Sequence, residues 1–212
     1  MVPRSPNSSG MTLVELVASF AVVLLLAGIV VPTVKARIEA ARIERAERDI
    51  TVLGSAVRDF WRANGVWPCR DGAGNADGLD VLVTGATVPT SNPWSSSTDW
   101  WSRVSGRSDV LWNHLGRNTP GGSSSAPYPS SRSQGWRGPF LDATPLDPWG
   151  RPYVVLVGAG HASPSGSDPV HLVVLSAGSD GEITTPIQLT TSATSTGVIA
   201  AGDVGLLVWR RT

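Results

Sequence analysis

The sequence predicts an α+β protein, in which one long N-terminal helix packs on a small antiparallel β-sheet near the C-terminus. Three features carry this prediction: an unbroken apolar run at residues 11–34, a helical repeat of apolar residues in 35–64, and short β-type runs beyond residue 150. The chain has 212 residues, which suits a single domain with an N-terminal appendage.

Residues 11–34 read MTLVELVASFAVVLLLAGIVVPTV, and their one acidic side chain is Glu15. Roughly 20 apolar residues in a helix are enough to cross the hydrocarbon core of a bilayer. A leader, residues 1–10, precedes the run, and charged residues begin directly after it with Lys35. We therefore expect a transmembrane helix over residues 11–34.

Residues 35–64 are expected to continue as an amphipathic helix. Apolar residues recur at spacings of three and four, which places them on one helical face. Charged residues surround these positions, with Glu44 and Arg48 one turn apart. This charged face is either solvated or paired with neighbouring copies of the chain. Asn64-Gly65 predicts the end of the helix. The apolar positions are Ile43, Ala46, Ile50, Leu53, Val57 and Phe60.

Residues 65–138 form a connecting region rich in Gly, Ser, Pro and Trp. Within it, Leu79–Thr84 and Asp109–Leu115 are predicted as short helices, the second one capped by Ser108. Two roles are open for its tryptophans: they pack the loops onto the helix or against neighbouring copies, or they form a surface on which sugar rings stack. These tryptophans are Trp94, Trp100, Trp101, Trp112 and Trp136.

Residues 139–212 are predicted to form the antiparallel sheet. Its strands are Tyr153–Val157, Val170–Ser176 and Gly205–Arg210, and turn-rich segments separate them. A sheet of short strands needs one buried face, so we expect it to pack on the apolar stripe of the helix.

Charge and motif content exclude several classes of function. The 17 basic and 17 acidic side chains balance, which argues against a nucleic-acid-binding protein. A single cysteine, Cys69, excludes an internal disulfide and leaves either a buried thiol or an intermolecular bridge. His114, His161 and His171 lack metal-ligand spacing, and no hydrolase or nucleotide-binding motif occurs, so we expect no enzyme.

The junction between the leader and the apolar run carries a specific motif. Gly10 and Met11 precede T-L-V-E-L at residues 12–16, so that Glu15 and Pro32 are the fifth and twenty-second residues counted from Met11. This order resembles the type IV pilin and pseudopilin family. The resemblance implies cleavage between Gly10 and Met11 by a prepilin peptidase, N-methylation of Met11, and retention of the apolar helix. A secretory signal peptide, by contrast, is cut after its apolar run.

Glu15 and Pro32 are the residues that the resemblance assigns to assembly. A carboxylate in hydrocarbon is costly unless it is paired. The resemblance supplies the amine of Met11 in the same or an adjacent subunit, and the alternative is a carboxylate that is protonated or reaches the membrane interface. Pro32 weakens the helix near Gly28 by removing a backbone donor. It implies either a plain kink or a segment that melts on assembly.

Two segments of the C-terminal part resemble the major pseudopilin of type II secretion systems. Residues 136–141 read WRGPFL and residues 146–153 read LDPWGRPY, close to the W-R-G-P-Y-L and D-P-W-G-x-P-Y sequences of those proteins. Residues 176–181, SAGSDG, and 201–204, AGDV, resemble loop segments that follow in the same proteins. Together these segments imply a type IV pilin-like fold. The D-P-W-G sequence itself predicts a structural corner that leads into a strand.

Calcium is the cofactor that this resemblance implies, because the corresponding loops of the resembled pseudopilins bind it. Asp180 and Asp203 are the metal ligands by motif position, and Glu182 with nearby carbonyls would complete the roughly six to eight oxygens that Ca²⁺ takes. The chain departs from the pattern, because a Thr/Ser-rich stretch, Thr184–Gly197, separates the two acids and Asp203 stands where relatives often carry two acids. The alternative is a plain hairpin turn at Asp180-Gly181.

The resemblances imply a structural subunit of a helical pseudopilus filament, which supports protein export across the outer membrane. The chain would start in the bacterial inner membrane as a single-pass protein with a periplasmic headgroup and pass into a periplasmic or cell-surface filament. The implied partners are further copies of the chain, minor pilin-like subunits, the prepilin peptidase and an inner-membrane assembly platform. Nucleic acid is not expected as a primary ligand.

Two other functions stay open from the sequence. A surface type IV pilus subunit, used for adhesion, motility or DNA uptake, shares the same N-terminal features. A signal-anchored periplasmic domain that binds glycans and never polymerises would keep its leader and tolerate Glu15→Leu.

Overall fold

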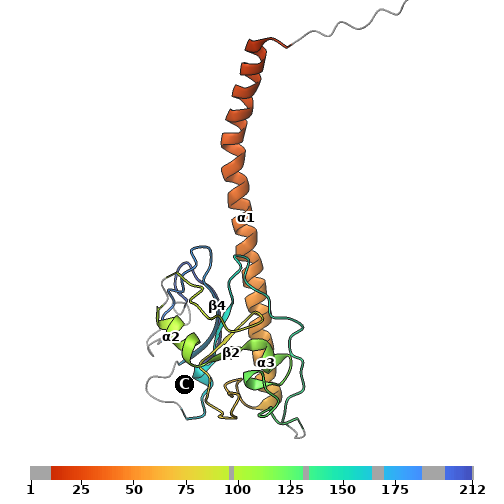
Figure 1. The fold of residues 1–212 in the computed structure, drawn as a ribbon, viewed down its shortest axis with the longest axis vertical. Helices are drawn as coiled ribbons and strands as arrows, with labels where there is room; N and C mark the ends of the chain where they lie inside the picture. The colour runs from red at the N-terminus through yellow and green to blue at the C-terminus, as the bar shows by residue number, and fades with distance from the viewer. Residues whose placement is uncertain (1–10, 96–97, 131–133, 164–169, 188–198, 212) are drawn as a thin grey trace, which may run out of the picture. The chain divides into compact units, whose positions relative to one another are not determined.

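The computed structural model describes residues 11–95, 98–130, 134–163, 170–187 and 199–211. The chain divides into two compact units, residues 1–41 and 42–212. The long helix α1, Leu13–Asn64, contributes residues to both units (Figure 1). The second unit holds every β-strand and is called the headgroup below.

Helix α1 confirms the single continuous helix that the sequence predicts. It contains one stretch whose length and hydropathy suit a membrane span, and no residue of that stretch is buried within the chain. The helix ends at Asn64, where Gly65 turns the backbone with φ of 71°. A positive φ is easily reached by glycine, which explains why the predicted stop holds.

The headgroup contains one mixed sheet of five strands in the order β2-β1-β3-β4-β5. Strands β1 and β2 are parallel, and the other neighbouring pairs are antiparallel. The sequence predicted the three C-terminal strands but not the parallel pair, so the expected all-antiparallel sheet is corrected to a mixed one. The strands are β1 Val81–Val83, β2 Ser108–Val110, β3 Val154–Leu156, β4 His171–Ser176 and β5 Val204–Arg210.

Both short helices predicted in the connecting region were at least partly wrong. Leu79–Thr84 contains β1 instead, because a short apolar run does not distinguish a fully buried strand from a helix. Asp109–Leu115 begins in β2, and only Leu111–Leu115 forms a helix, α3, whose N-terminus has no side-chain cap. Ser108 therefore belongs to a strand.

The sheet is buried on both faces, and alternate residues of each inner strand divide between two apolar cores. On β3, Val155 faces the core that includes α1, whereas Val154 and Leu156 face the other core. The connecting region covers this second face through Trp94 and helix α2, Thr98–Gly106. In Figure 1, α1 and α2 accordingly lie on opposite sides of the sheet within the headgroup.

The apolar stripe of α1 packs on the first face as predicted, with one exception. Ala46, Ile50, Leu53, Val57 and Phe60 are buried, whereas Ile43 is 39% exposed. The prediction for Ile43 was wrong because helical periodicity shows which residues share a face and not where the covering sheet begins. The helix and sheet approach closely at Gly54, where an added Cβ would lie 2.8 Å from the Leu206 side chain.

Phe60 is the aromatic centre of this contact, and its removal tests the packing. Its ring is fully buried and meets the rings of Tyr128 and Phe140 at centroid distances of 4.9 and 5.5 Å. We expect Phe60→Ala to lower the free energy of unfolding by about 3–5 kcal/mol, measured by denaturant titration of the detergent-solubilised chain. Val52→Ala, on the exposed face of the same helix, should change it by about 0.5 kcal/mol or less. Equal effects of the two substitutions would contradict this packing.

Candidate assembly segment and headgroup loop

The N-terminus of α1 is a charged turn on an otherwise apolar helix. Thr12 Oγ1 accepts a hydrogen bond from the backbone N–H of Glu15 at 3.3 Å, and Ser19 donates to the Glu15 carbonyl at 2.8 Å. A carboxylate in the first turn is favoured by the positive end of the helix dipole. In the part of the chain that the structure describes, no basic group forms an ion pair with Glu15. Pairing of Glu15 with the amine of Met11, in the same or an adjacent subunit, stays a prediction.

The predicted processing site lies at the edge of the described residues. Gly10 falls outside them, and Met11 is 65% exposed just before the helix. Cleavage between the two residues and methylation of Met11 stay predictions.

Pro32 lies inside α1, and the helix continues through it. Proline has no backbone N–H, so the Gly28 carbonyl lacks its usual partner four residues ahead. The Thr33 hydroxyl donates to the neighbouring Ile29 carbonyl at 3.0 Å. The described chain therefore shows a continuous helix with one missing backbone hydrogen bond, and melting of this segment on assembly stays a prediction.

The D-P-W-G sequence forms the structural corner that was predicted. Asp147 is buried, and its Oδ1 accepts hydrogen bonds from the backbone N–H groups of Trp149 and Arg151 at 3.1 and 2.7 Å. Its Oδ2 accepts the hydroxyl of Ser176 at 2.8 Å, which ties the corner to the end of β4. Gly150 has φ of 85°, the left-handed conformation that the turn needs. The corner and the S-A-G-S-D-G loop are therefore directly bonded to each other.

The corner also connects the sheet to a charged residue of α1, which sequence reasoning missed. Tyr153 donates its hydroxyl to Asp49 Oδ2 at 3.0 Å, and Arg45 lies 3.6 Å from the same carboxylate. Burial and the adjacent Asp49 charge raise the pKa of Tyr153. The position of Asp49 beside Ile50, at the border of the apolar stripe, could have indicated a partly buried carboxylate. No pattern near it in the sequence indicates Tyr153 as its partner.

Asp180 and Asp203, the predicted metal ligands, lie close together in the loop between β4 and β5. An added Cβ at Gly202 would lie 3.1 Å from Asp180 Oδ2, which places Asp180 against the residue that precedes Asp203. Asp203 Oδ2 accepts the backbone N–H groups of Thr184 and Thr185 at 3.1 and 2.7 Å, and also the Thr185 hydroxyl. Burial raises the pKa of Asp203, with a further contribution from the charge of Asp180.

These residues fit a calcium ion poorly. The described residues contain no group of three or more acidic, histidine or cysteine side chains arranged to hold a metal. Asp203 accepts hydrogen bonds from backbone N–H groups of its own loop. Asp180 Oδ1 accepts the N–H of Glu182 at 3.1 Å. Much of the inserted stretch, residues 188–198, lies outside the described residues. Calcium binding stays a prediction of the resemblance.

Comparisons with known proteins address the same segments. A family model described as "Type II secretion system (T2SS), protein G" matches residues 125–188, which include the corner and the S-A-G-S-D-G loop. The "Type II secretion system core protein G" of Pseudomonas aeruginosa PAO1 is 26% identical over 176 residues, which cover 83% of this chain and 87% of the relative. No solved structure gives a significant match. The chain is therefore similar to protein G of type II secretion over most of its length. The resemblance to the major pseudopilin of these systems, drawn from its sequence, is confirmed.

The tryptophans predicted either to pack or to stack on sugars contribute to packing. Trp94 and Trp100 are 1% and 2% exposed and belong to the second core. Trp101, Trp112 and Trp136 are partly buried against the cores. The sugar-stacking interpretation is therefore wrong for the first two, which have no exposed ring face.

Cys69 is a buried thiol, one of the two alternatives that the sequence left open. It is 1% exposed and donates from Sγ to the Val157 carbonyl at 3.1 Å. Burial raises its pKa, which disfavours the reactive thiolate. An intermolecular bridge would require this part of the headgroup to open.

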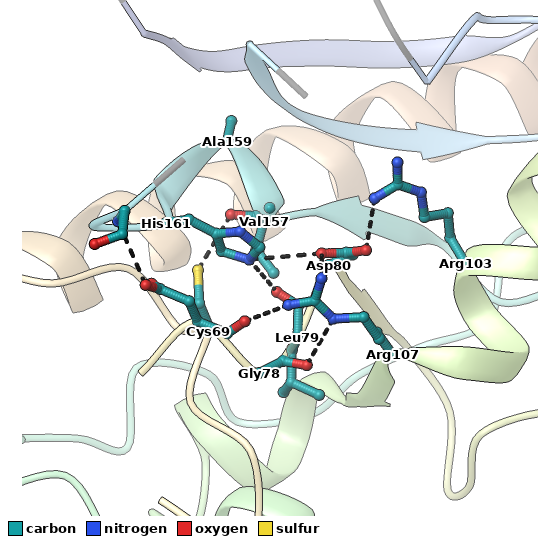
Figure 2. A network of polar contacts seen from close by, with 12 residues as sticks. Cys69, Gly78, Leu79, Asp80, Arg103, Arg107, Val157, Ala159 and His161 are labelled. Atoms are coloured by element: carbon teal, nitrogen blue, oxygen red, sulfur yellow. Dashed lines mark hydrogen bonds and ion pairs between the residues drawn. The ribbon is translucent and has the colours of Figure 1, made fainter. Parts of the chain in front are cut away.

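A buried polar cluster fastens the connecting region to the sheet, and sequence reasoning missed it (Figure 2). Asp80, 1% exposed, lies 2.6 Å from Arg103 of α2 and 3.3 Å from Arg107. His161 adds a bond from its Nε2 to the Leu79 carbonyl at 2.9 Å. The acid sits just before β1, so the two arginines hold α2 against the strand that it covers. The second buried polar set joins His114 to Asp109 and Tyr128, each at 2.9 Å.

His171 gives the headgroup a predicted sensitivity to acid. The side chain is buried at the start of β4, and neither ring nitrogen has a hydrogen-bond partner among the described residues. Burial and the nearby Arg210 charge lower the pKa of His171. The unfolded chain, whose histidines titrate near about 6.5, therefore binds the proton more readily, and stability is lost as the pH falls below neutrality.

We expect the melting temperature of the detergent-solubilised chain to fall between pH 7.5 and pH 5, followed by tryptophan fluorescence. His171→Leu removes the titrating group and should make this fall shallower. Identical pH profiles for the two proteins would show that His171 does not carry the effect.

Proposed function

We propose that this chain is the major structural subunit of a pseudopilus, a helical filament that supports protein export across the outer membrane. The observation that carries the proposal is the similarity to a type II secretion core protein G over most of both chains. The similarity covers 83% of this chain and 87% of the relative, so it reaches well beyond the segment with the D-P-W-G corner. The role is structural and involves no catalysis by this chain.

The apolar part of α1 supplies the main driving force for assembly. Large apolar side chains are exposed all around the helix between Leu13 and Val34, including Phe20 at 60% and Leu24 at 71%. Each buried side chain of this size contributes about 1.5–3 kcal/mol when it leaves water. The membrane covers these residues before assembly, and the helices of neighbouring subunits cover them in the filament.

Glu15 determines how neighbouring subunits align. Transfer of an unpaired carboxylate into an apolar environment is unfavourable, so the subunit is stabilised when a cation reaches it. Cleavage between Gly10 and Met11 would create such a cation, the α-amine of Met11. Because this amine and the carboxylate occur once per subunit, their pairing fixes one axial register between adjacent helices.

The headgroup presents the charged face of α1 toward solvent or neighbouring headgroups. Its ion pairs are exposed and local, as between Arg48 and Glu44 at 3.9 Å, and such pairs contribute little to stability. In the proposed filament the headgroup packs around the core formed by the helices. Its further partners are minor pilin-like subunits, the prepilin peptidase and the assembly platform of the inner membrane. Before assembly the subunit is a single-pass protein of that membrane.

The similarity to protein G favours this role over a surface pilus subunit. The glycan-binding alternative loses support, because two of the five tryptophans that suggested it, Trp94 and Trp100, are buried in the second core.

Glu15→Ala tests the alignment role. We expect the leader still to be removed and the filament yield, measured by electron microscopy of sheared material, to fall about tenfold or more. A loss of about 1.4 kcal/mol in the free energy of subunit association is enough for a tenfold fall in the association constant. Glu44→Ala, an exposed acid farther along the same helix, should assemble like the unmodified chain. Normal filaments from the Glu15 variant would refute the role of this carboxylate.

The processed N-terminus is a separate prediction. Mass spectrometry of the membrane-extracted protein should show a chain that begins at Met11 with one methyl group on its α-amine. Gly10→Val should leave the leader attached in the same cells. Detection of residues 1–10 on the filament form would contradict the proposed processing.

A further inference from the structure

The loop between β4 and β5 is fastened by groups of the protein itself. From Gly178 to Val204 the sequence holds three acidic residues, Asp180, Glu182 and Asp203, and the Thr/Ser-rich stretch between them adds no carboxylate. A calcium site takes about six to eight oxygens, so these acids would need most of their oxygens free. The hydrogen bonds that these oxygens already accept therefore decide whether a calcium ion can bind here.

The carboxylate of Asp203 is occupied by donors of the loop. Thr184 and Thr185 donate two backbone N–H groups and one hydroxyl to its Oδ2. A carboxylate oxygen has about two lone pairs, so three donors leave none on Oδ2 for a metal ion. Oδ1 accepts the N–H of Thr184 at 3.3 Å. Thr185, in turn, is 1% exposed, and its hydroxyl oxygen accepts the N–H of Ala200 at 3.0 Å. Asp203 and Thr185 thus hold the two ends of the inserted stretch together.

Two carbonyls of the loop are also occupied, both by donors from the connecting region. Trp100 of α2 donates its indole N–H to the Thr185 carbonyl at 2.7 Å. Ser95 donates its backbone N–H to the Gly181 carbonyl at 2.9 Å. These bonds come from the layer that covers the second face of the sheet, so the loop is clamped from that side.

A fixed cation lies at the same loop. Arg151, the residue after the D-P-W-G corner, donates from Nη1 to the Gly178 carbonyl at 3.3 Å. Its guanidinium also lies against Gly181, where an added Cβ would collide with it. The guanidinium brings a permanent positive charge to the turn that carries Asp180.

We propose that Trp100, Thr185 and Arg151 do here what a bound divalent cation would do, so that this headgroup folds without calcium. The loop closes through protein donors on Asp203, an indole clamp from α2 and an arginine at the turn. This inference concerns the stability of the headgroup and does not depend on filament formation.

The test compares thermal unfolding of the full detergent-solubilised chain in EDTA and in millimolar CaCl₂. We expect the two melting temperatures to agree within about 1 °C. Trp100→Phe leaves the buried Thr185 carbonyl without its donor, so it should lower the melting temperature by about 2–8 °C in both solutions. Trp101→Phe is the matched control, because this neighbouring ring is only partly buried, and it should change the melting temperature by about 1 °C or less.

A second measurement covers the case in which Trp100→Phe does not fold. Isothermal titration of the unmodified chain with CaCl₂ should detect no site of submillimolar affinity. Either a saturable calcium site of that affinity, or a melting temperature that EDTA lowers and CaCl₂ restores, would overturn the proposal. Glu15→Ala, which is designed to prevent assembly, should leave both measurements unchanged, so the failure of one proposal is distinguishable from the failure of the other.

Discussion

The apolar helix that begins at Leu13 sets the central constraint on this protein, because no residue of its span-length stretch is buried within the chain. Exposure of such a surface to water is unfavourable by tens of kcal/mol in total, at about 1.5–3 kcal/mol per large side chain. The helix therefore has to be covered by lipid or by other helices. A subunit whose helix is covered by lipid before assembly and by neighbouring helices after it can pass from a membrane into a filament without exposing this surface to water. In the proposed filament Glu15 would give that exchange a direction, since a carboxylate is unfavourable in lipid and favourable beside an amine.

The headgroup solves a second burial problem, that of a sheet with two apolar faces. The stripe of α1 covers one face, and the connecting region with Trp94 and α2 covers the other. Large aromatic side chains suit this second layer because a few of them bury much area on short, irregular elements. The buried Asp80 between two arginines then fixes α2 in place, at the desolvation cost that any buried charge carries. Trp94 and Trp100 thus suit the thin layer that the connecting region forms on this face.

Periodic features of the fold were predictable from sequence, and contacts between distant segments were not. The helical repeat identified Ile50, Leu53, Val57 and Phe60 correctly, because local spacing determines which residues share a face. It failed at Ile43, since the extent of the covering sheet depends on residues far along the chain. The D-P-W-G corner was predictable because Asp147 and Gly150 act within four residues of each other. The bonds from Tyr153 to Asp49 and from Trp100 to Thr185 join residues 104 and 85 positions apart, and no local pattern encodes them.

The corner and the loop after β4 form one hydrogen-bonded unit. Asp147 binds Ser176 at the end of β4, and Arg151 binds the Gly178 carbonyl at the start of the loop, so the corner is fixed to both. The family model matches this unit within residues 125–188 and does not extend to Trp100 or Asp203. The corner thus belongs to the part of the fold that resembles protein G, whereas the clamp on the loop comes from the Trp-rich layer outside the match. A loop held from both sides by the protein needs no ion at its centre, and its inserted stretch can lengthen because its two ends are joined through Asp203 and Thr185.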